Sequence, residues 1–417
     1  MIVSTNQTMR GASMMYNPLK VFILYARFGD GHWQAASALR QSFAKLGNVE
    51  VKLVDLLEES HPVLNGVSRF VYRKSYSVLP QAYGWVYQRT KTMKPDSMFA
   101  SWLHSFGVPA LLKMVEKERP DAIVHTFPTL ACPQVMHKMR RKIPMYNVIT
   151  DFDLHLRWVH PAIDKYYVAT DDMRRQLCEL GIEPHRVAAT GIPIRPEFQT
   201  LSAGTAFPVG RPTILVMASA GMAPVHAASL CRSLAERCAA RVVVVCGRNR
   251  ALRQALETQL GGNPNVTILG YVERIQDWMA VASGIVTKPG GLTLSEAIAA
   301  GLPIFLYRPV PGQEYNNARY LESKGAAVIC RTIGQLTQAI AERLEKPRLR
   351  EQMLQAIYSL RKPDASDTIA LDIARQLNIM EVVPAIDSGK LRHRDDLSLV
   401  PASPELQRRA ACEQVIP

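Results

Sequence analysis

The sequence predicts an α/β protein made of two doubly wound domains. Short runs of β-branched and other apolar residues recur along the 417 residues, and a longer stretch of helical character separates each run from the next. Strands that are apolar throughout and alternate with helices indicate parallel sheets covered on both faces. The chain is long enough for two domains, each with a hydrophobic core of its own.

Twelve segments have the length and composition of buried strands. Those in the first half lie at 21–25, 49–54, 122–125, 146–150, 165–168 and 187–190. Those in the second half lie at 213–217, 242–246, 266–269, 285–287, 304–307 and 327–329. Twelve strands exceed the usual width of one open sheet, and they divide evenly into two sets of six. We therefore expect one sheet in each half of the chain.

The boundary between the halves is expected at 191–196, where a glycine and two prolines interrupt the pattern. This division gives an N-terminal domain at 18–195 and a C-terminal domain at 196–380. Residues 381–417 combine proline, serine and mixed charges without a helical period, so we expect this tail to be disordered.

The charge balance indicates an anionic partner. The 50 Lys and Arg residues outnumber the 36 Asp and Glu residues and leave a net charge of +14. An excess of this kind favours contact with nucleic acid or with an acidic membrane surface. The alternative is a basic protein whose charge serves solubility alone.

The sequence also indicates where the chain works. It contains no apolar run near the ~20 residues that a transmembrane helix needs. Residues 1–18 lack the apolar core of a signal peptide. The seven cysteines are scattered without a C-x-x-C pair, which is typical of reduced thiols and not of disulfides or a zinc site. We therefore expect a cytoplasmic protein whose membrane contact, if any, is peripheral.

The segment 287–297, which reads T-K-P-G-G-L-T-L-S-E-A, is the strongest candidate for an anion site. It joins a short apolar strand to a helix through the adjacent glycines Gly290 and Gly291. Glycines permit close approach of the backbone, and a helix N-terminus presents N–H groups and the positive end of its dipole to an anion. An ordinary strand–turn–helix connection is the alternative.

A second polar cluster follows about twenty residues later, at 311–317, with the sequence P-G-Q-E-Y-N-N. Amide and carboxylate side chains can bind sugar hydroxyls. A diphosphate bound by the glycine pair and a sugar bound by this cluster would together form a nucleotide-sugar site.

The end of the first strand carries a histidine at the start of a helix. Residues 28–36 resemble a dinucleotide fingerprint, but Gln34 stands where the third glycine belongs. Asp55 follows about twenty residues on, so a dinucleotide site stays an alternative. A helix N-terminus disfavours an imidazolium, so we expect a neutral His32 that can accept a proton. A purely structural histidine is the other alternative.

Asp151 and Asp153 form a D-x-D sequence at the end of a predicted strand. Strand alternation would turn both carboxylates to the same face, so a metal site is an alternative. Because this sequence lies in the first half of the chain, away from the glycine pair, we expect no metal.

Basic and aromatic residues alternate in the segment 65–99. They include Arg69, Phe70, Arg73, Lys74, Trp85 and Arg89. Basic residues attract a segment to anionic headgroups by about 1 kcal/mol each, and aromatic side chains can then enter the interface. An amphipathic core helix with a solvated basic face is one alternative, and a nucleic-acid surface is another.

Several short sequences occur together and in order: G-D-G-H at 29–32, H-T-F-P at 125–128, T-D-F at 150–152, W-V-H at 158–160, T-G-I-P-I-R-P at 190–196 and L-G-Y-V-E-R at 269–274. With the glycine-pair helix and the P-G-Q-E sequence, they make the chain resemble the glycosyltransferases of family 28 that make monogalactosyl- and glucosyl-diacylglycerol. It looks closest to the bacterial processive diacylglycerol β-glucosyltransferases, whose products anchor lipoteichoic acid. The resemblance covers residues 20–375.

The resemblance implies the GT-B architecture, in which two Rossmann-like domains face each other across a cleft. The N-terminal domain would bind the acceptor and the membrane, and the C-terminal domain would bind the nucleotide sugar. A C-terminal helix at about 363–378 would cross back onto the N-terminal domain.

The resemblance also implies roles for single residues. His32 would be the general base, and Asp151 would support it or touch the acceptor. Glu296 would bind the ribose, and Gln313 with Glu314 would hold sugar hydroxyls. The implied donor-binding residues are Gly31, Ser219, Gly221, Tyr271, Val272, Gly290, Gly291, Thr293, Glu296, Gln313, Glu314 and Asn317.

The activity implied is an inverting, metal-independent transfer of glucose from UDP-glucose to 1,2-diacylglycerol, repeated to add further sugars, at the cytoplasmic face of the cell membrane. No cofactor and no nucleic-acid partner are expected, and the sequence indicates no oligomeric state. The alternatives are a monogalactosyldiacylglycerol synthase, a transferase to another lipid, and a UDP-sugar sensor. His32 favours an enzyme, because a sensor needs no base.

Overall fold

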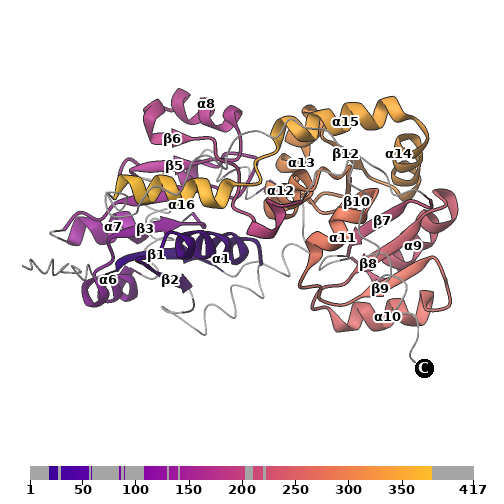
Figure 1. Ribbon diagram of the computed structural model, residues 1–417, viewed down its shortest axis with the longest axis horizontal. Coiled ribbons are helices and arrows are strands. Elements are labelled where there is room, and N and C mark those ends of the chain that lie inside the picture. Colours follow the sequence, from indigo (N-terminus) through magenta and orange to yellow (C-terminus); the bar gives the residue numbers. More distant parts are fainter. Residues whose placement is uncertain are drawn as a thin grey trace, which may run out of the picture. The chain divides into compact units, whose positions relative to one another are not determined.

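The computed structural model describes residues 18–26, 30–55, 58, 84–85, 89, 108–128, 131–139, 141–201, 210–218 and 222–377. Within these residues, strands alternate with helices along the chain and form two six-stranded parallel sheets (Figure 1). The predicted fold class, α/β with two doubly wound domains, is confirmed. The predicted tail at 381–417 lies outside the described residues.

The N-terminal sheet has the strand order β2-β1-β3-β4-β5-β6. Its strands are β1 (Leu19–Tyr25), β2 (Val49–Asp55), β3 (Ala122–His125), β4 (Met145–Val148), β5 (Lys165–Tyr167) and β6 (Val187–Ala188). Its helices are α1 (Asp30–Lys45), α6 (Val108–Glu118), α7 (Ala131–Lys138) and α8 (Asp171–Glu179). The strand order reverses between β1 and β3. Open α/β sheets bind ligands at the carboxyl ends of the strands beside such a switch point.

The C-terminal sheet has the order β12-β11-β10-β7-β8-β9, which is the Rossmann order with its switch point between β7 and β10. Its strands are β7 (Thr213–Met217), β8 (Arg241–Val245), β9 (Val266–Leu269), β10 (Gly284–Thr287), β11 (Ile304–Tyr307) and β12 (Ala327–Cys330). Its helices are α9 (Pro224–Arg237), α10 (Arg250–Leu260), α11 (Ile275–Val281), α12 (Gly291–Ala299), α13 (Gln313–Ser323), α14 (Ile333–Glu345) and α15 (Pro347–Leu360).

All twelve predicted strand segments coincide with observed strands, because most of the strands are apolar runs buried on both faces. β10 and β11, for example, are buried at every position. Some predicted ends are wrong: the segment 146–150 ends as a strand at Val148, and 187–190 ends at Ala188. The regular pairing with a neighbouring strand ends after β4. Thr150 instead contacts His32 and Gly291, and the local sequence does not indicate these contacts.

The last described helix, α16 (Ala365–Gln376), packs on the N-terminal sheet beside α1 (Figure 1). Ile369 and Ile373 are fully buried in the core that also contains residues of β1 and α1. At the helix surface, the Tyr167 hydroxyl donates to Asp372 Oδ2 over 2.7 Å. The predicted crossover helix at 363–378 is therefore confirmed.

In the described part of the chain, none of the helices combines the length and the apolar character needed to cross a membrane.

The packing of α16 gives a testable prediction. Ile369→Ala is expected to lower the free energy of unfolding of the N-terminal domain by about 2–5 kcal/mol, because it leaves a cavity in a fully buried position. Thr368→Ala, at the adjacent exposed position, is the control and should change it by less than about 0.5 kcal/mol. Urea denaturation followed by circular dichroism measures both. Equal effects of the two substitutions would contradict the packing described for α16.

Candidate active site

His32 lies in the first turn of α1, at the switch point of the N-terminal sheet. Its Nδ1 is 2.6 Å from the carbonyl oxygen of Thr126 and 3.1 Å from the hydroxyl of Thr150. Thr126 follows β3 and Thr150 follows β4, and these strands are neighbours in the sheet. Three adjacent strand ends therefore place the imidazole.

The contacts of His32 define which nitrogen can accept a proton. A carbonyl oxygen only accepts hydrogen bonds, so Nδ1 carries the hydrogen and donates it to Thr126, while Nε2 keeps its lone pair. Burial lowers the pKa of His32, and the nearby charge of Asp151 opposes this shift. The edge of the ring meets Phe127 at 5.3 Å between centroids. The imidazole is thus neutral at pH 7, as the sequence led us to expect, and burial adds to the reason.

The glycine pair begins α12, with Gly290 as its N-cap and Gly291 as its first residue. A Cβ atom at position 291 would lie 2.1 Å from the carbonyl oxygen of Thr150, so this position requires glycine. At position 290 a Cβ would meet nothing within 4 Å. Thr293 is half-buried in the first turn. The close approach that the sequence predicted at Gly291 is therefore made, in this structure, by the protein's own backbone.

The glycine-rich starts of α1 and α12 lie close together. A Cβ at Gly31 would be 4.0 Å from the Cβ of Leu292. Thr150 connects the two elements directly, because its hydroxyl contacts His32 and its carbonyl oxygen packs against Gly291. The candidate base and the candidate diphosphate site thus share one neighbour.

The amides of α13 bind the carboxylates that follow β4. The helix starts after Gly312, whose φ of 106° favours glycine. Gln313 donates to Asp151 Oδ1, and Asn316 donates to Asp153 Oδ2 over 2.8 Å. Burial raises the pKa of Asp151, and the amide donors oppose this shift. The structure places Gln313 on a carboxylate of the protein; its expected contact with a sugar stays a prediction.

The geometric argument for a metal at the D-x-D sequence is wrong. β4 ends at Val148, so Asp151 and Asp153 do not lie on a strand and alternation does not apply to them. Across the described ranges, no group of three or more His, Cys, Asp or Glu side chains is arranged to hold a metal ion.

Glu296 on α12 is buried with only 5% of its surface exposed. Burial raises its pKa to about 7, although the Arg195 guanidinium lies 3.5 Å from Oε1 and opposes the shift. Arg195 also donates to the carbonyl oxygen of Glu273 over 2.7 Å. A buried carboxyl with a strongly shifted pKa and a specific charged partner is a common mark of a functional site.

Lys288, two residues before Gly290, is a basic residue that the sequence analysis did not single out. Burial lowers its pKa, and the charge of Glu314 on α13 opposes this shift. The electrostatic coupling places the Lys288 ammonium and the Glu314 carboxylate near each other. Lys288 is thus a partly buried basic side chain near the start of the candidate diphosphate site.

Tyr271 and Val272 follow β9. The Tyr271 side chain is 55% exposed, and the guanidinium carbon of Arg248 lies 4.8 Å from its ring centroid. Val272 is half-buried against the core. The exposed aromatic ring at this sheet edge is compatible with a nucleobase nearby.

Several predicted residues lie outside the described part of the chain. These are Arg69, Phe70, Arg73, Lys74, Ser219 and Gly221. In the same 65–99 segment, Trp85 is described and 65% exposed, and Arg89 lies 5.7 Å from its ring centroid. A Cβ at Gly84 would be 2.5 Å from Pro311, so this part of the segment contacts the start of the P-G-Q-E sequence.

The sequence analysis missed the contacts of Thr126, Thr150 and Arg195. A signal for the two threonines existed: each is a polar residue just beyond a buried strand beside the switch point. For Arg195 the signal was a charged residue directly after the apolar G-I-P-I stretch at 191–194. The partners of these three residues lie far away in the sequence, so no local sequence pattern identifies the partners.

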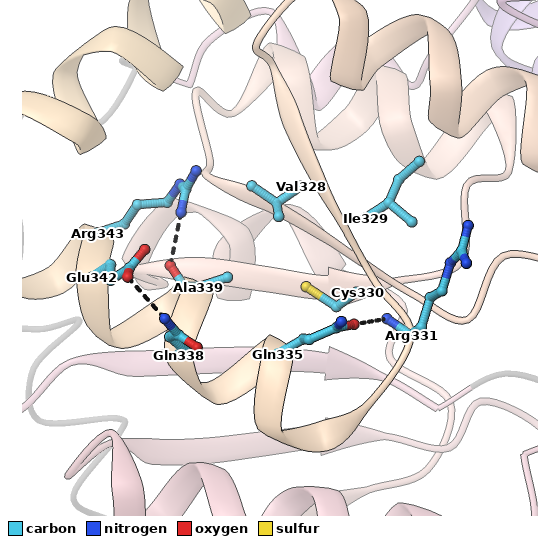
Figure 2. Close-up of a pocket in the computed structure, with 9 residues that line it drawn as sticks. All are labelled: Val328, Ile329, Cys330, Arg331, Gln335, Gln338, Ala339, Glu342 and Arg343. Atoms are coloured by element: carbon cyan, nitrogen blue, oxygen red, sulfur yellow. Dashed lines mark hydrogen bonds between the residues drawn. The ribbon is translucent and has the colours of Figure 1, made fainter.

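A pocket of about 450 Å³ opens between the edge strand β12 and α14, and it contains none of the predicted site residues. Figure 2 shows its polar groups paired with one another: Gln338 donates to Glu342, and Arg343 donates to the Ala339 carbonyl. Gln335 accepts a hydrogen bond over 2.9 Å from the backbone N–H of Arg331, the residue that follows β12.

Comparisons with known proteins identify the family of the chain. Residues 32–194 match the monogalactosyldiacylglycerol (MGDG) synthase family, and residues 213–369 match the glycosyltransferase family 28 C-terminal domain. The chain is 38% identical over 358 residues to a processive diacylglycerol beta-glucosyltransferase of Bacillus cytotoxicus, covering 84% of this chain and 92% of that protein.

Two solved structures share the fold at low identity. MurG of Acinetobacter baumannii has a TM-score of 0.54 at 16% identity, and the UDP-GlcNAc 2-epimerase of Neisseria meningitidis bound to UDP-GlcNAc has 0.55 at 15%. Each comparison covers 86% of this chain and 100% of the other. At such low identity these structures show the fold alone. With its 38% identity to a relative matched over almost its full length, the chain belongs to the processive diacylglycerol beta-glucosyltransferase family of glycosyltransferases.

Proposed function

We propose that this protein transfers glucose from UDP-glucose to 1,2-diacylglycerol and then to the glucolipid product, giving mono- and diglucosyldiacylglycerol. The name of the Bacillus cytotoxicus relative supports this acceptor and this sugar. The observation that carries the proposal is the shared contact at Thr150, which joins a neutral histidine to the N-terminus of the glycine-pair helix. A base and an anion-binding helix end at adjacent positions suit a displacement at a sugar phosphate.

In the proposed reaction, Nε2 of His32 takes the proton from the acceptor hydroxyl. The hydroxyl oxygen forms a bond to the anomeric carbon of glucose as the bond from that carbon to the UDP oxygen breaks. The configuration at carbon inverts, and the leaving UDP carries the electron pair of the broken bond. The N–H groups that begin α12 and the Lys288 ammonium stabilise the charge that develops on UDP.

The donor would lie along the carboxyl ends of the C-terminal strands. Glu296 would accept hydrogen bonds from the ribose hydroxyls, and the backbone at Tyr271 and Val272 would meet the uracil. Ser219 and Gly221, after β7, would face the phosphates. These roles rest on family resemblance, and the switch point between β7 and β10 supports them.

The enzyme would need no metal, because the helix end and Lys288 supply positive charge to the diphosphate. It would bind the cytoplasmic face of the membrane peripherally through the basic and aromatic segment 65–99. The described part of that segment supports this: Trp85 is exposed and has the Arg89 guanidinium 5.7 Å from its ring centroid, an amphipathic pair suited to a lipid interface.

A second candidate uses galactose in place of glucose. The match of residues 32–194 to the MGDG synthase family favours it, because the name of that family states a monogalactosyl lipid as the product. Glucose and galactose differ at one hydroxyl, and a single hydrogen bond distinguishes them.

One experiment separates these functions. The purified protein is incubated with dioleoylglycerol in mixed micelles and with radiolabelled UDP-glucose or UDP-galactose, with and without EDTA, and the lipids are separated by thin-layer chromatography. We expect labelled mono- and diglucosyl lipids from UDP-glucose, unaffected by EDTA. Product from UDP-galactose alone would indicate the second candidate. UDP binding without any lipid product would identify a sensor and refute the proposal.

Removing the base tests the role of His32. His32→Ala is expected to lower kcat by about 10²–10⁴-fold, because general base catalysis is lost. The dissociation constant for UDP-glucose should change little. His185→Ala, at a histidine side chain that is 78% exposed, is the control and should keep full activity. Turnover in His32→Ala equal to that of the wild type would rule out this residue as the base.

Charge removal tests the membrane segment. The triple substitution of Arg69, Arg73 and Lys74 by alanine should weaken binding to vesicles that contain phosphatidylglycerol by at least about tenfold, because each charge contributes about 1 kcal/mol near the surface. The control replaces three exposed basic residues of the other domain, Arg331, Lys346 and Arg348. Vesicle co-sedimentation measures both variants. Equal binding by the two variants would argue against this surface.

Glu296→Gln tests the cost of a buried carboxyl. The pKa of Glu296 is about 7 in the folded chain, against 4.5 ordinarily. Its contribution to the stability of the wild type is therefore fully present below pH 4.5 and is lost as the pH rises through 7. The variant should therefore gain about 3 kcal/mol of stability over wild type between pH 4.5 and pH 8, while UDP binds less tightly.

Urea denaturation across this pH range, with calorimetry for UDP, measures both effects of Glu296→Gln. The exposed Glu116→Gln serves as the control and should change the free energy of unfolding by less than about 0.5 kcal/mol. A stability difference between Glu296→Gln and wild type that stays constant with pH would mean that the carboxyl carries no burial cost.

A further inference from the structure

Asn317 on α13 is fully buried, and its side-chain amide makes three hydrogen bonds to the protein. Its Oδ1 accepts from the backbone N–H of Phe152 over 2.9 Å. Its Nδ2 donates to Asp151 Oδ1 over 3.2 Å and to the carbonyl oxygen of Pro289 over 3.1 Å. The Phe152 donor and the Pro289 acceptor also define the orientation of the amide.

These three bonds join two parts of the proposed active site. Pro289 directly precedes Gly290, where the diphosphate would bind. Asp151 and Phe152 directly follow Thr150, whose hydroxyl contacts His32. One buried side chain thus links the segment before α12 to the segment after β4.

A second contact fixes the same segment to α13. The ring of Phe152 stacks on Tyr320 with 6.0 Å between centroids and 20° between planes. Tyr320 lies one helical turn after Asn317, so both residues contact the segment after β4 from one face of α13. Burial of Asn317 and the use of both its N–H groups leave it poorly suited to binding the donor, which is the role that family resemblance implied.

We propose that Asn317 is a positioning residue: it holds Asp151 and Thr150 beside His32 while it holds Pro289 at the diphosphate site, so that base and leaving group keep their relative position. The inference rests on the proposed function and reassigns Asn317 within that site. Gln313, which is half-buried and also donates to Asp151, remains available for exchange with a donor sugar.

Loss of the Asn317 amide should also change the electrostatics around the base. Asp151 interacts with His32 from α1, with Asp153 from its own segment, and with the amides of Gln313 and Asn317 from α13. The Asn317 donor favours the charged form of Asp151, and that charge favours the protonated form of His32. Without the donor, Asp151 is more often neutral and the pKa of His32 falls.

The test compares Asn317→Ala with Arg319→Ala, whose side chain is 64% exposed on the same helix. We measure kcat, the dissociation constants of UDP and UDP-glucose, and the pH profile of kcat/KM for transfer to dioleoylglycerol. Asn317→Ala should lower kcat by about 10–100-fold, as a displacement of about 1 Å can do. Both dissociation constants should stay within about twofold, and the acid limb of the profile should move to lower pH. Arg319→Ala should match the wild type in every measurement.

Two results would overturn the proposal. A weakened affinity for UDP-glucose, with UDP affinity and the pH profile unchanged, would make Asn317 a sugar ligand. A loss of kcat without any shift of the acid limb would make its role merely structural. If Asn317→Ala does not fold, Asn317→Ser, which keeps one donor and one acceptor, undergoes the same measurements. Failure of the wild-type enzyme to form glucolipid would refute the proposed function itself, which the wild-type assay reports separately.

Discussion

The close contact between the backbone at Thr150 and the start of α12 is the constraint on which the site depends. A side chain at position 291 would overlap the Thr150 carbonyl oxygen. The contact is possible only because glycine has no side chain. This contact brings the segment after β4 to α12 and α13. The carboxylates of Asp151 and Asp153 there accept hydrogen bonds from the side-chain amides of α13. His32 depends on the same segment, because its Nδ1 contacts both the Thr150 hydroxyl and the Thr126 carbonyl oxygen.

Exclusion of water gives the site its electrostatic character. Burial lowers the pKa of His32 and of Lys288, and it raises the pKa of Asp151 and of Glu296. Each shift favours the neutral form, which is the direction that desolvation imposes. In such surroundings the charge of a bound diphosphate would interact strongly with fixed dipoles and cations, and this is how preorganised sites stabilise a charged leaving group.

The positions of these groups follow from the topology of the two sheets. His32 follows β1 and Thr126 follows β3, on either side of the first switch point. The glycine pair follows β10, beside the second switch point. Helices leave in opposite directions at such points, so strand ends there are open to a ligand and their side chains can converge. The choice of sugar and acceptor is a finer matter, decided by single hydroxyl contacts.

The sequence by itself determined the secondary structure and the chemical types at the site. Apolar runs such as β8 and β10 are buried on both faces, so local composition was sufficient to predict all twelve strands. The histidine at a helix start and the glycine pair were likewise visible as local patterns.

The tertiary structure alone decided which groups meet. Nothing near Gly291 in the sequence indicates that Thr150 packs against it, and nothing near Asn317 names Phe152 or Pro289 as its partners. These contacts span up to 165 positions and arise from the packing of helices on two separate sheets. Local propensity carries no information about such contacts, because their energy comes from burial and hydrogen bonding between segments that are distant in the chain.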